Sequence, residues 1–402
     1  MLVSDILTEK DAISGPRAIR VAPRSLFHEF VNVAEIPVPA WQELAGRAVE
    51  PNIFYEPGWM RAVSSHAHCY RDAKVLLAWD GPAKKRLLGL MPVLTAWRAL
   101  KLPLPVLVAW QAYAPLRTPL LDREMPDAGA HGLIDAAIGA GAKALLLPMQ
   151  TTDGLALRVL RRALKKRGFV CEVENRRERA RLNTTSDADA LLLGSLGAKK
   201  MKELRRQRNR LADHGAVTLA VADRPAEVSA ALEKFLTLEA SGWKGKRGTA
   251  LVQNEGDAAF IREAARELAA RGQFEVLALN IGGRLAASCL LIKAGRQAYF
   301  FKLAYDESES RNSPGVQITL DLTRRLCADS GIEEADSTAD ANHPMIDHIW
   351  RDRLPLGDVF APLARGRIQI GAIRTTIRAR HGLRERARAV LHCLRKIREK
   401  QK

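Results

Sequence analysis

One order of predicted elements occurs twice along the chain, and this repetition limits the possible folds more than any other feature of the sequence. In the second half, apolar residues that alternate or recur at threes and fours predict a strand, two helices, a three-stranded meander, a helix, a strand, a short helix and a last strand. Those elements cover 216–222, 226–240, 257–270, 274–281, 284–293, 297–305, 316–329, 332–336, 344–350 and 356–360. The Gly282-Gly283 pair predicts a two-residue hairpin between the first two strands of the meander.

The first half predicts the same order of elements. They cover 26–36, 40–48, 57–67, 74–79, 87–94, 106–113, 127–140, 143–148, 155–166 and 169–173. Two such copies predict an α/β fold with two tandem domains, each with a mixed, mostly antiparallel sheet that helices cover on both faces. We assign the domains to 1–190 and 191–364, followed by a basic helical tail at 365–402.

The positive charge of the chain is concentrated in this tail. The 402 residues carry 63 Lys and Arg against 45 Asp and Glu, and the tail alone has 13 Lys and Arg against two acidic residues. Its apolar residues recur at threes and fours, which predicts an amphipathic helix with a basic face. Such a helix can lie on an anionic membrane surface or an acidic partner. It can equally dock on the body of the protein with its basic face in solvent.

A second basic cluster covers 195–215. Seven Lys or Arg, Arg206 among them, and one acid lie between Lys199 and Arg210, on a predicted helix that stops at Gly215. The cluster has no interleaved aromatics for base stacking, and the chain has no zinc-finger, RRM or KH signature. We therefore expect phosphate attraction without sequence-specific DNA binding, to RNA or to a small phosphorylated ligand.

Composition excludes several other classes of protein. The hydrophobic share of 47% is that of a folded globular chain, and the most apolar stretch, 102–110, is too short for a spanning helix and contains two prolines. The start of the chain does not resemble a secretory signal. Five cysteines without a CxxC pair, and histidines without a completing cluster, favour a reducing compartment and no metal site. We expect a cytoplasmic protein, peripheral on the inner face of the membrane if its tail binds lipid.

Four segments carry a resemblance to a known family. They are 41–63, the basic helix that ends RRQRNRLADHG, LEASGWKGKRGTAL at 238–251, and YFFKLAYDESESRNSPGVQITLDL at 299–322 with the later Asp336. Together they resemble the CelD-like group of GNAT acyltransferases, which is linked by name to polysaccharide biosynthesis and is similar to the tandem-GNAT FemAB-like proteins. The resemblance implies acyl transfer to an amine or hydroxyl. The chain departs from many relatives after Asp336, where Met345 and Ile346 replace a Tyr-Lys pair, so the acceptor is not implied.

The best candidate phosphate site is the turn before the helix at 316–329. Its residues are Arg311, Ser313, Pro314, Gly315 and Val316. Serine can cap this helix, proline fits its first turn, and glycine lets a ligand approach the backbone. Free N–H groups and a partial positive charge at a helix N-terminus attract phosphate. Because the family resemblance puts the coenzyme A diphosphate at this turn, we expect acetyl-CoA or another acyl-CoA as donor substrate; an ordinary capped helix start is the alternative.

The candidate catalytic residues lie near this turn. Glu239 and Asp336 are candidate bases. The structural alternative for Glu239 is an ion pair with a nearby Lys or Arg, and the structural alternative for Asp336 is a cap of the segment that follows it. Tyr305 can protonate a departing thiolate unless the sheet buries it. The candidate substrate-binding residues are Trp243, Lys244, Lys302 and Arg206. Tyr299 and Lys302 are three residues apart on one strand, so they face opposite sides of the sheet unless a bulge intervenes.

Three functions fit these observations. The first is an acyl-CoA-dependent acyltransferase, expected to be an N-acetyltransferase, that acts on a sugar, a glycan or another cell-envelope precursor. The second is a FemAB-like transferase that uses aminoacyl-tRNA, with the basic helix along the RNA backbone; we expect tRNA less than a small-molecule donor. The third is a non-catalytic protein that binds an anionic polymer or scaffolds a synthase.

Overall fold

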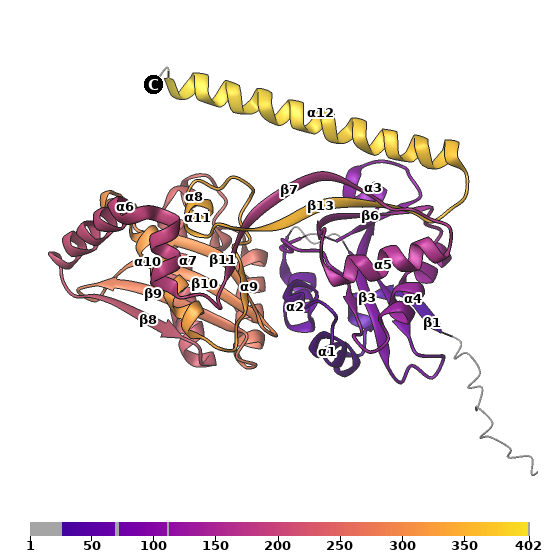
Figure 1. The fold of residues 1–402 in the computed structure, drawn as a ribbon, viewed down its shortest axis with the longest axis horizontal. Coiled ribbons are helices and arrows are strands. Elements are labelled where there is room, and N and C mark those ends of the chain that lie inside the picture. Colours follow the sequence, from indigo (N-terminus) through magenta and orange to yellow (C-terminus); the bar gives the residue numbers. More distant parts are fainter. Residues whose placement is uncertain (1–25, 69–71, 111, 401–402) are drawn as a thin grey trace, which may run out of the picture.

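The computed structural model describes residues 26–68, 72–110 and 112–400, with all of their side chains except those of 385 and 388–400. Two lobes are joined by two long strands, and a C-terminal helix runs along one side of both (Figure 1). The N-terminal lobe contains β1 (Phe27–Asn32), η1 (Val33–Glu35), α1 (Val38–Gly46), η2 (Ile53–Tyr55), α2 (Pro57–His66), β2 (Lys74–Trp79), β3 (Leu87–Thr95), α3 (Ala96–Leu100), β4 (Val106–Ala109), β5 (Leu120–Leu121), α4 (Pro126–Gly139), β6 (Ala144–Thr151) and α5 (Leu155–Lys166).

The long strand β7 (Glu172–Asn183) leads into the C-terminal lobe. This lobe contains α6 (Ala188–Ala212), β8 (Val217–Ala222), α7 (Pro225–Ser241), α8 (Trp243–Lys246), η3 (Leu251–Gln253), α9 (Glu255–Ala269), β9 (Phe274–Ile281), β10 (Arg284–Ala294), β11 (Gln297–Tyr305), η4 (Glu307–Asn312), α10 (Pro314–Ala328), β12 (Glu334–Asp336) and α11 (Ile346–Ile349). The second long strand, β13 (Asp352–Pro362), returns to the first lobe and is followed by α12 (Arg367–Lys400). The predicted mixed α/β fold with a helical C-terminus is confirmed.

The strands form one continuous sheet with the order β1-β2-β3-β4-β6-β13-β7-β12-β11-β10-β9-β8, and β5 pairs with β3 off this path. Only the β4–β6 and β11–β12 pairs are parallel among the described strands, so the sheet is mixed and mostly antiparallel, as predicted. Each parallel pair follows a crossover through a helix, α4 in one lobe and α10 in the other. The repeated element order therefore produces two similar halves of one sheet.

The two lobes exchange their last strands. β7, which ends the first repeat, pairs with β12 of the C-terminal lobe, whereas β13, which ends the second repeat, pairs with β6 of the N-terminal lobe. The two exchanged strands also pair with each other in antiparallel register from Asp352 to Phe360. The sheet consequently does not divide at residue 190, which lies inside α6, and the ranges 1–190 and 191–364 describe sequence repeats rather than separate sheets.

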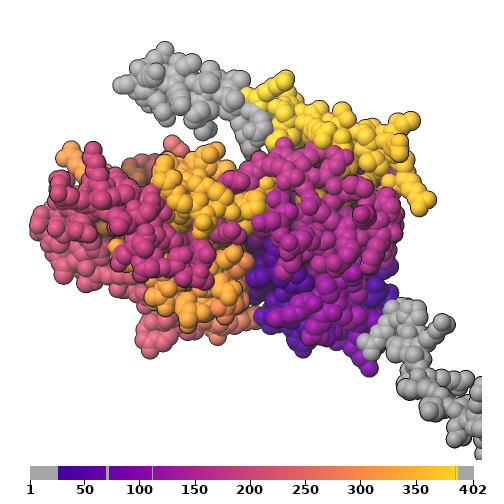
Figure 2. Space-filling view, in the orientation of Figure 1, coloured from indigo at the N-terminus to yellow at the C-terminus, as the bar shows by residue number. Residues whose placement is uncertain are grey.

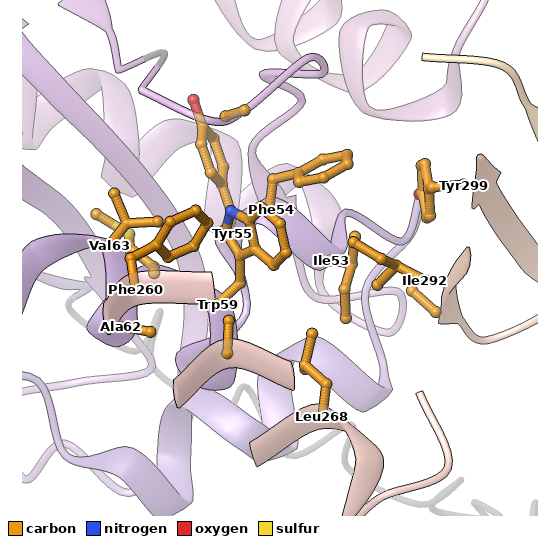
Figure 3. Packing of buried hydrophobic residues seen from close by; sticks show 14 of the residues in the cluster. Ile53, Phe54, Tyr55, Trp59, Ala62, Val63, Phe260, Leu268, Ile292 and Tyr299 are labelled. Carbon is orange, nitrogen blue, oxygen red and sulfur yellow. The ribbon is translucent and has the colours of Figure 1, made fainter. Parts of the chain in front are cut away.

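A shared hydrophobic core also joins the lobes. Trp59 on α2 makes edge-on ring contacts with Phe260 on α9 and Phe301 on β11, at centroid distances of 5.1 and 4.9 Å. Phe54 packs edge-on against Tyr299 at 5.1 Å. Phe54, Trp59, Phe260 and Tyr299 belong to one buried cluster that draws on both lobes (Figure 3). The partly buried Phe301 packs against this cluster. Because large aromatic side chains dominate the free energy of such cores, we expect the lobes to unfold together.

The first turns of α12 dock on the N-terminal lobe. Ile373 is 4% exposed and packs in a cluster with Val108 of β4 and Phe360 of β13, and Ile370 and Ile377 extend this contact. Figure 2 shows this part of the helix, in yellow, lying against the lobe. The first turns of the tail therefore dock on the body of the protein, which was one of its two predicted alternatives. No helix in the described part of the chain combines the length and apolarity that a membrane span requires.

The predicted strand at 169–173 was wrong in extent, because β7 covers Glu172–Asn183. Its sequence, EVENRRERARLN, is mostly charged, and its pairing partners β12 and β13 come from the other repeat. A strand with charged residues on both of its faces lacks the apolar alternation by which strands are recognised in a sequence. The start of the chain, Cys69 and the side chain of Cys393 lie outside the described residues, so the expectations that concern them stay predictions.

Candidate functional site: a cationic cleft beside a buried lysine–glutamate cluster

A cleft of about 1050 Å³ opens where the two lobes meet. Its walls come from the exchanged strands, from β6, from β11 and from the segment that follows β12, and α12 contributes residues from Ile377 to Arg384. Of the described residues that line it, seven are Lys or Arg and three are Asp or Glu. The cationic residues are Arg117, Arg177, Arg179, Lys302, Arg378, Arg380 and Arg384. This excess of positive charge favours an anionic ligand.

The cleft exists because the parallel strand pairs separate. β11 and β12 pair only over 297–299 with 334–336, and β4 and β6 pair only over 106–108 with 144–146. Beyond these short ladders the chains diverge, and the residues that follow them, among them Tyr113 and Thr338, line the cleft. Ligands in open α/β sheets bind where neighbouring strands diverge at their carboxyl ends.

A β-bulge determines which side chain of β11 reaches the cleft. Leu290 of β10 pairs with Lys302 and Leu291 pairs with Phe300, so Phe301 is an extra residue. A bulge shifts the alternation of side chains by one position. Lys302 therefore faces the same side of the sheet as Tyr299, which regular alternation forbids, and it lines the cleft beside Phe301.

Lys302 belongs to a buried cluster with two other predicted site residues. The Glu239 carboxylate accepts hydrogen bonds from Lys244 Nζ at 3.0 Å, from Lys302 Nζ at 3.3 Å and from the Leu251 N–H at 2.9 Å. Its side chain is fully buried, whereas both lysine side chains are 20% exposed. Lys244 also donates to the Leu303 carbonyl at 3.0 Å. The structure thus brings Glu239, Lys244 and Lys302 together.

The electrostatics of this cluster keep Glu239 ionised. Burial by itself raises the pKa of Glu239, but the ammonium groups of Lys302 and Lys244 outweigh it, and the net pKa is lowered from its ordinary value. Burial lowers the pKa of Lys244, although Glu239 opposes this effect. A carboxylate with three donors and a lowered pKa is a weak proton acceptor, so this geometry suits positioning of the lysines better than general base catalysis.

Asp336 is also held in an ion pair. Arg179 of β7 donates to its carboxylate, and the Thr338 N–H donates to Oδ1 at 2.9 Å. Both residues of the pair are buried, at 1% exposure for Arg179 and 8% for Asp336. Arg179 donates as well to the Pro115 carbonyl at 3.1 Å. Asp336 does not line the large cleft; it anchors a guanidinium that does.

The predicted phosphate turn is less open than its sequence suggests. Ser313 lies in the left-handed region with φ of 54° and makes no capping hydrogen bond to α10. Its carbonyl accepts from the N–H groups of Val316 at 2.9 Å and Gln317 at 3.0 Å, and Pro314 has no N–H, which leaves the Gly315 amide as the unbonded donor of this turn. Gly315 is buried below Tyr305, whose ring lies 3.3 Å from the position of an added Cβ.

The helix α6 packs across the same region. The Leu204 carbonyl accepts from Gln317 Nε2 at 2.9 Å, and Arg208 pairs with Asp321 of α10 at 2.9 Å. Arg206, on the same helix, is exposed, and so is Arg311 of the turn. Ser313 thus does not cap α10 as predicted. None of the turn residues at 311–316 belongs to the described lining of the large cleft.

The remaining predicted residues lie around the Glu239 cluster. A small cavity of about 20 Å³ is lined by Glu239, Trp243, Lys244 and Tyr305, among others. Trp243 is 44% exposed, and the guanidinium of Arg247 lies 5.0 Å from its ring centroid. Tyr305 is partly buried and packs against Gly315, which agrees with burial in the sheet as the alternative to a catalytic role.

Sequence reasoning identified none of the six arginines that line the cleft as site residues, and three of them lie outside the tail. Arg117 follows β4, while Arg177 and Arg179 lie on β7. The alternating arginines of ENRRERAR were the available signal, because positions 177 and 179 share one face of a strand. Among the described residues no group of three or more His, Cys, Asp or Glu is arranged to hold a metal ion.

Known proteins share this architecture. Residues 198–343 match the family model described as an acetyltransferase (GNAT) domain. The fold is similar to the C-terminal domain (DUF2156) described as part of a lysylphosphatidylglycerol synthetase from Agrobacterium fabrum, with a TM-score of 0.52 and 14% identity over 85% of this chain and 95% of that chain. It is also similar to FemX, with a TM-score of 0.51 and 12% identity over 81% of this chain and 96% of that chain.

A protein of unknown function from Bacteroides thetaiotaomicron is similar as well, with a TM-score of 0.50 and 14% identity over 83% of this chain and 99% of that chain. No curated protein sequence matches the chain. At these identities the structural matches establish a common fold. They do not test the narrower resemblance to the CelD-like group, which stays a prediction.

Proposed function

We propose that the chain is a GNAT-type acyltransferase that transfers an acyl group to an amine or hydroxyl of an anionic substrate bound in the cleft. The match of 198–343 to a GNAT acetyltransferase domain supports the reaction class. The observation that carries the proposal is the cationic cleft at the diverging strands β11 and β12, with Lys302 at its wall. A sugar, a glycan or another cell-envelope precursor is the acceptor class that we propose.

In this proposal Lys302 acts on the reacting groups. When the acceptor nitrogen or oxygen bonds to the acyl carbon, the carbonyl oxygen becomes an oxyanion, and a nearby ammonium group stabilises that charge. The acyl–donor bond then breaks, and the donor leaves as a thiolate or alkoxide that takes up the proton given up by the acceptor nitrogen or oxygen. Glu239 is a positioning residue, because its carboxylate holds Lys302 and Lys244 at fixed places.

Acyl-CoA is the donor that we propose first, because it is the donor associated with the matched domain type. Its diphosphate has two candidate sites, the exposed Arg311 with the Gly315 amide, as the sequence suggests, and the arginines of the cleft. A second donor, aminoacyl-tRNA, is favoured by one observation: α6 presents exposed Lys199, Lys202 and Arg206 on its solvent side. A row of lysines and arginines of this kind follows a nucleic acid backbone without reading sequence.

Titration calorimetry with coenzyme A and acetyl-CoA tests the first donor, followed by a turnover assay with an acceptor panel of amino sugars and glycans. We expect Lys302→Met to lose at least tenfold in turnover, whereas Lys234→Met, on the exposed side of α7, serves as the matched control. RNase-sensitive copurification of tRNA, together with no heat from coenzyme A at millimolar concentration, would replace the first donor with the second. Binding without turnover of either donor would support the non-catalytic alternative.

A further inference from the structure

A partly buried cation, Arg117, lines the cleft without an ion-pair partner among the described residues. No carboxylate of the described residues lies within ion-pair distance of Arg117, and its buried Nε has no hydrogen-bond partner. Burial lowers the pKa of Arg117 to about 10, although Tyr55 and Asp358 oppose this shift. Tyr55 does not neutralise the charge, because burial raises its own pKa and its hydroxyl donates to the Trp110 carbonyl at 2.8 Å.

Two neighbouring arginines reinforce this charge. Arg177 pairs with Asp358, and Arg179 pairs with Asp336, so each is fixed in place by a carboxylate. The Nε of each is also buried without a hydrogen-bond partner. Asp358 has little capacity left for Arg117, because it also accepts from Asn175 Nδ2 at 2.9 Å and the Met149 N–H at 3.1 Å.

Buried charges normally have partners, because removing an ion from water costs several kcal/mol. An uncompensated guanidinium beside two fixed ones is therefore a site prepared for an anion that arrives with the substrate. Guanidinium groups bind phosphate oxygens through two parallel hydrogen bonds, and several of them can surround the tetrahedral group. A carboxylate has two oxygens and is planar, so it satisfies fewer of these donors.

We propose that Arg117, Arg177 and Arg179 form a phosphoryl-binding subsite in the floor of the cleft. The substrate class is thereby a phosphate monoester or diphosphate, and its phosphoryl group provides the counter-ion of Arg117. This inference deepens the proposed function and rests on it for the acyl transfer, but binding of a phosphoryl group requires no turnover.

Inorganic pyrophosphate is the probe for this subsite. Thermal unfolding and calorimetry of the full chain are measured with pyrophosphate and with sodium chloride at equal ionic strength, so that general screening is subtracted. We expect pyrophosphate to raise Tm more than chloride does, and Arg117→Met to weaken its binding by about 10- to 100-fold. Arg61→Met is the matched control, since Arg61 is exposed on α2 and does not line the cleft.

The unliganded variant distinguishes a binding role from a structural one. Removing the partly buried charge of Arg117, which lacks an ion-pair partner, should leave Tm unchanged or raise it in the absence of pyrophosphate, whereas loss of a structural contact lowers it. Arg117→Lys keeps the charge but loses the forked geometry, so we expect intermediate affinity, and it replaces Arg117→Met if that variant does not fold. Wild-type affinity in both variants, or no difference between pyrophosphate and chloride for the wild type, would overturn the subsite.

Coenzyme A identifies which substrate carries the phosphoryl group. If it competes with pyrophosphate and Arg117→Met weakens both, the group belongs to the donor. If Arg117→Met abolishes pyrophosphate binding and leaves coenzyme A binding intact, the group belongs to the acceptor. Turnover by an Arg117→Met variant with wild-type KM would refute the subsite while leaving the acyltransferase proposal in place.

Discussion

Replacing Glu239 with glutamine tests whether the buried cluster depends on charge. The substitution keeps the size of the side chain and an oxygen for the Leu251 N–H, but it leaves Lys244 and Lys302 without their shared counter-ion. Removing one partner of a buried ion pair costs about 3–5 kcal/mol. Since a chain of 402 residues has an unfolding entropy of about 0.8 kcal/mol/K, we expect Tm to fall by about 4–6 °C.

Scanning calorimetry at pH 7 measures this shift, and a double-mutant cycle isolates its cause. Adding Lys302→Met to Glu239→Gln removes one of the two unpaired cations, so the double variant should be more stable than the sum of the single effects predicts. Additive losses, or an unchanged Tm in Glu239→Gln, would refute the charge argument. The same Glu239→Gln variant should lose turnover together with the fixed position of Lys302.

Further predictions concern acid stability, packing and the tail. Hydrogen bonds from Arg86 and Arg47 outweigh the burial of Asp122 and lower its pKa to about 2. The ionised carboxylate therefore contributes about 2 kcal/mol to the free energy of unfolding above pH 4, and this contribution is lost as the pH falls toward 2. The free energy of unfolding of Asp122→Asn should be lower than that of the wild type at pH 7 and converge with it near pH 2. Gly129→Ala should cost about 1–3 kcal/mol, because its Cβ would lie 2.3 Å from the Leu88 carbonyl oxygen, and urea unfolding measures this loss. Because the basic face of the tail attracts anionic lipid, truncation after Ala364 should reduce flotation with anionic liposomes. Equal flotation of both forms would exclude the membrane-binding alternative for the tail.

Much of the fold follows from local patterns in the sequence. The meander of the second repeat is predicted within one residue of β9, β10 and β11, because apolar alternation and the Gly282-Gly283 turn act over short distances. The exchange of β7 and β13 does not follow from any local pattern. Either β7 or β13 could complete each half of the sheet, because the two repeats offer strands of similar kind as pairing partners.

The candidate site shows the same division. Glu239 and Lys244 are five residues apart, and their pairing was the structural alternative that the sequence itself suggested. Lys302 joins them through the bulge at Phe301, a single extra residue that no pattern announced. Arg179 and Asp336 are 157 residues apart and meet only because β7 crosses to β12. Contacts that depend on strand exchange were therefore beyond sequence reasoning.

Strand exchange also explains why this cleft can be strongly charged and still ordered. Each fixed arginine of the floor is held by a carboxylate that the other repeat supplies, Asp358 for Arg177 and Asp336 for Arg179. Neither repeat alone contains both members of these pairs, so the ion pairs form only when both lobes have folded. A partly buried and partly uncompensated cluster of cations opposes folding by itself, and the aromatic core between α2, α9 and β11 supplies the stability that keeps it in place. Conflict between local electrostatics and overall stability is the pattern expected where residues are retained for binding rather than for folding.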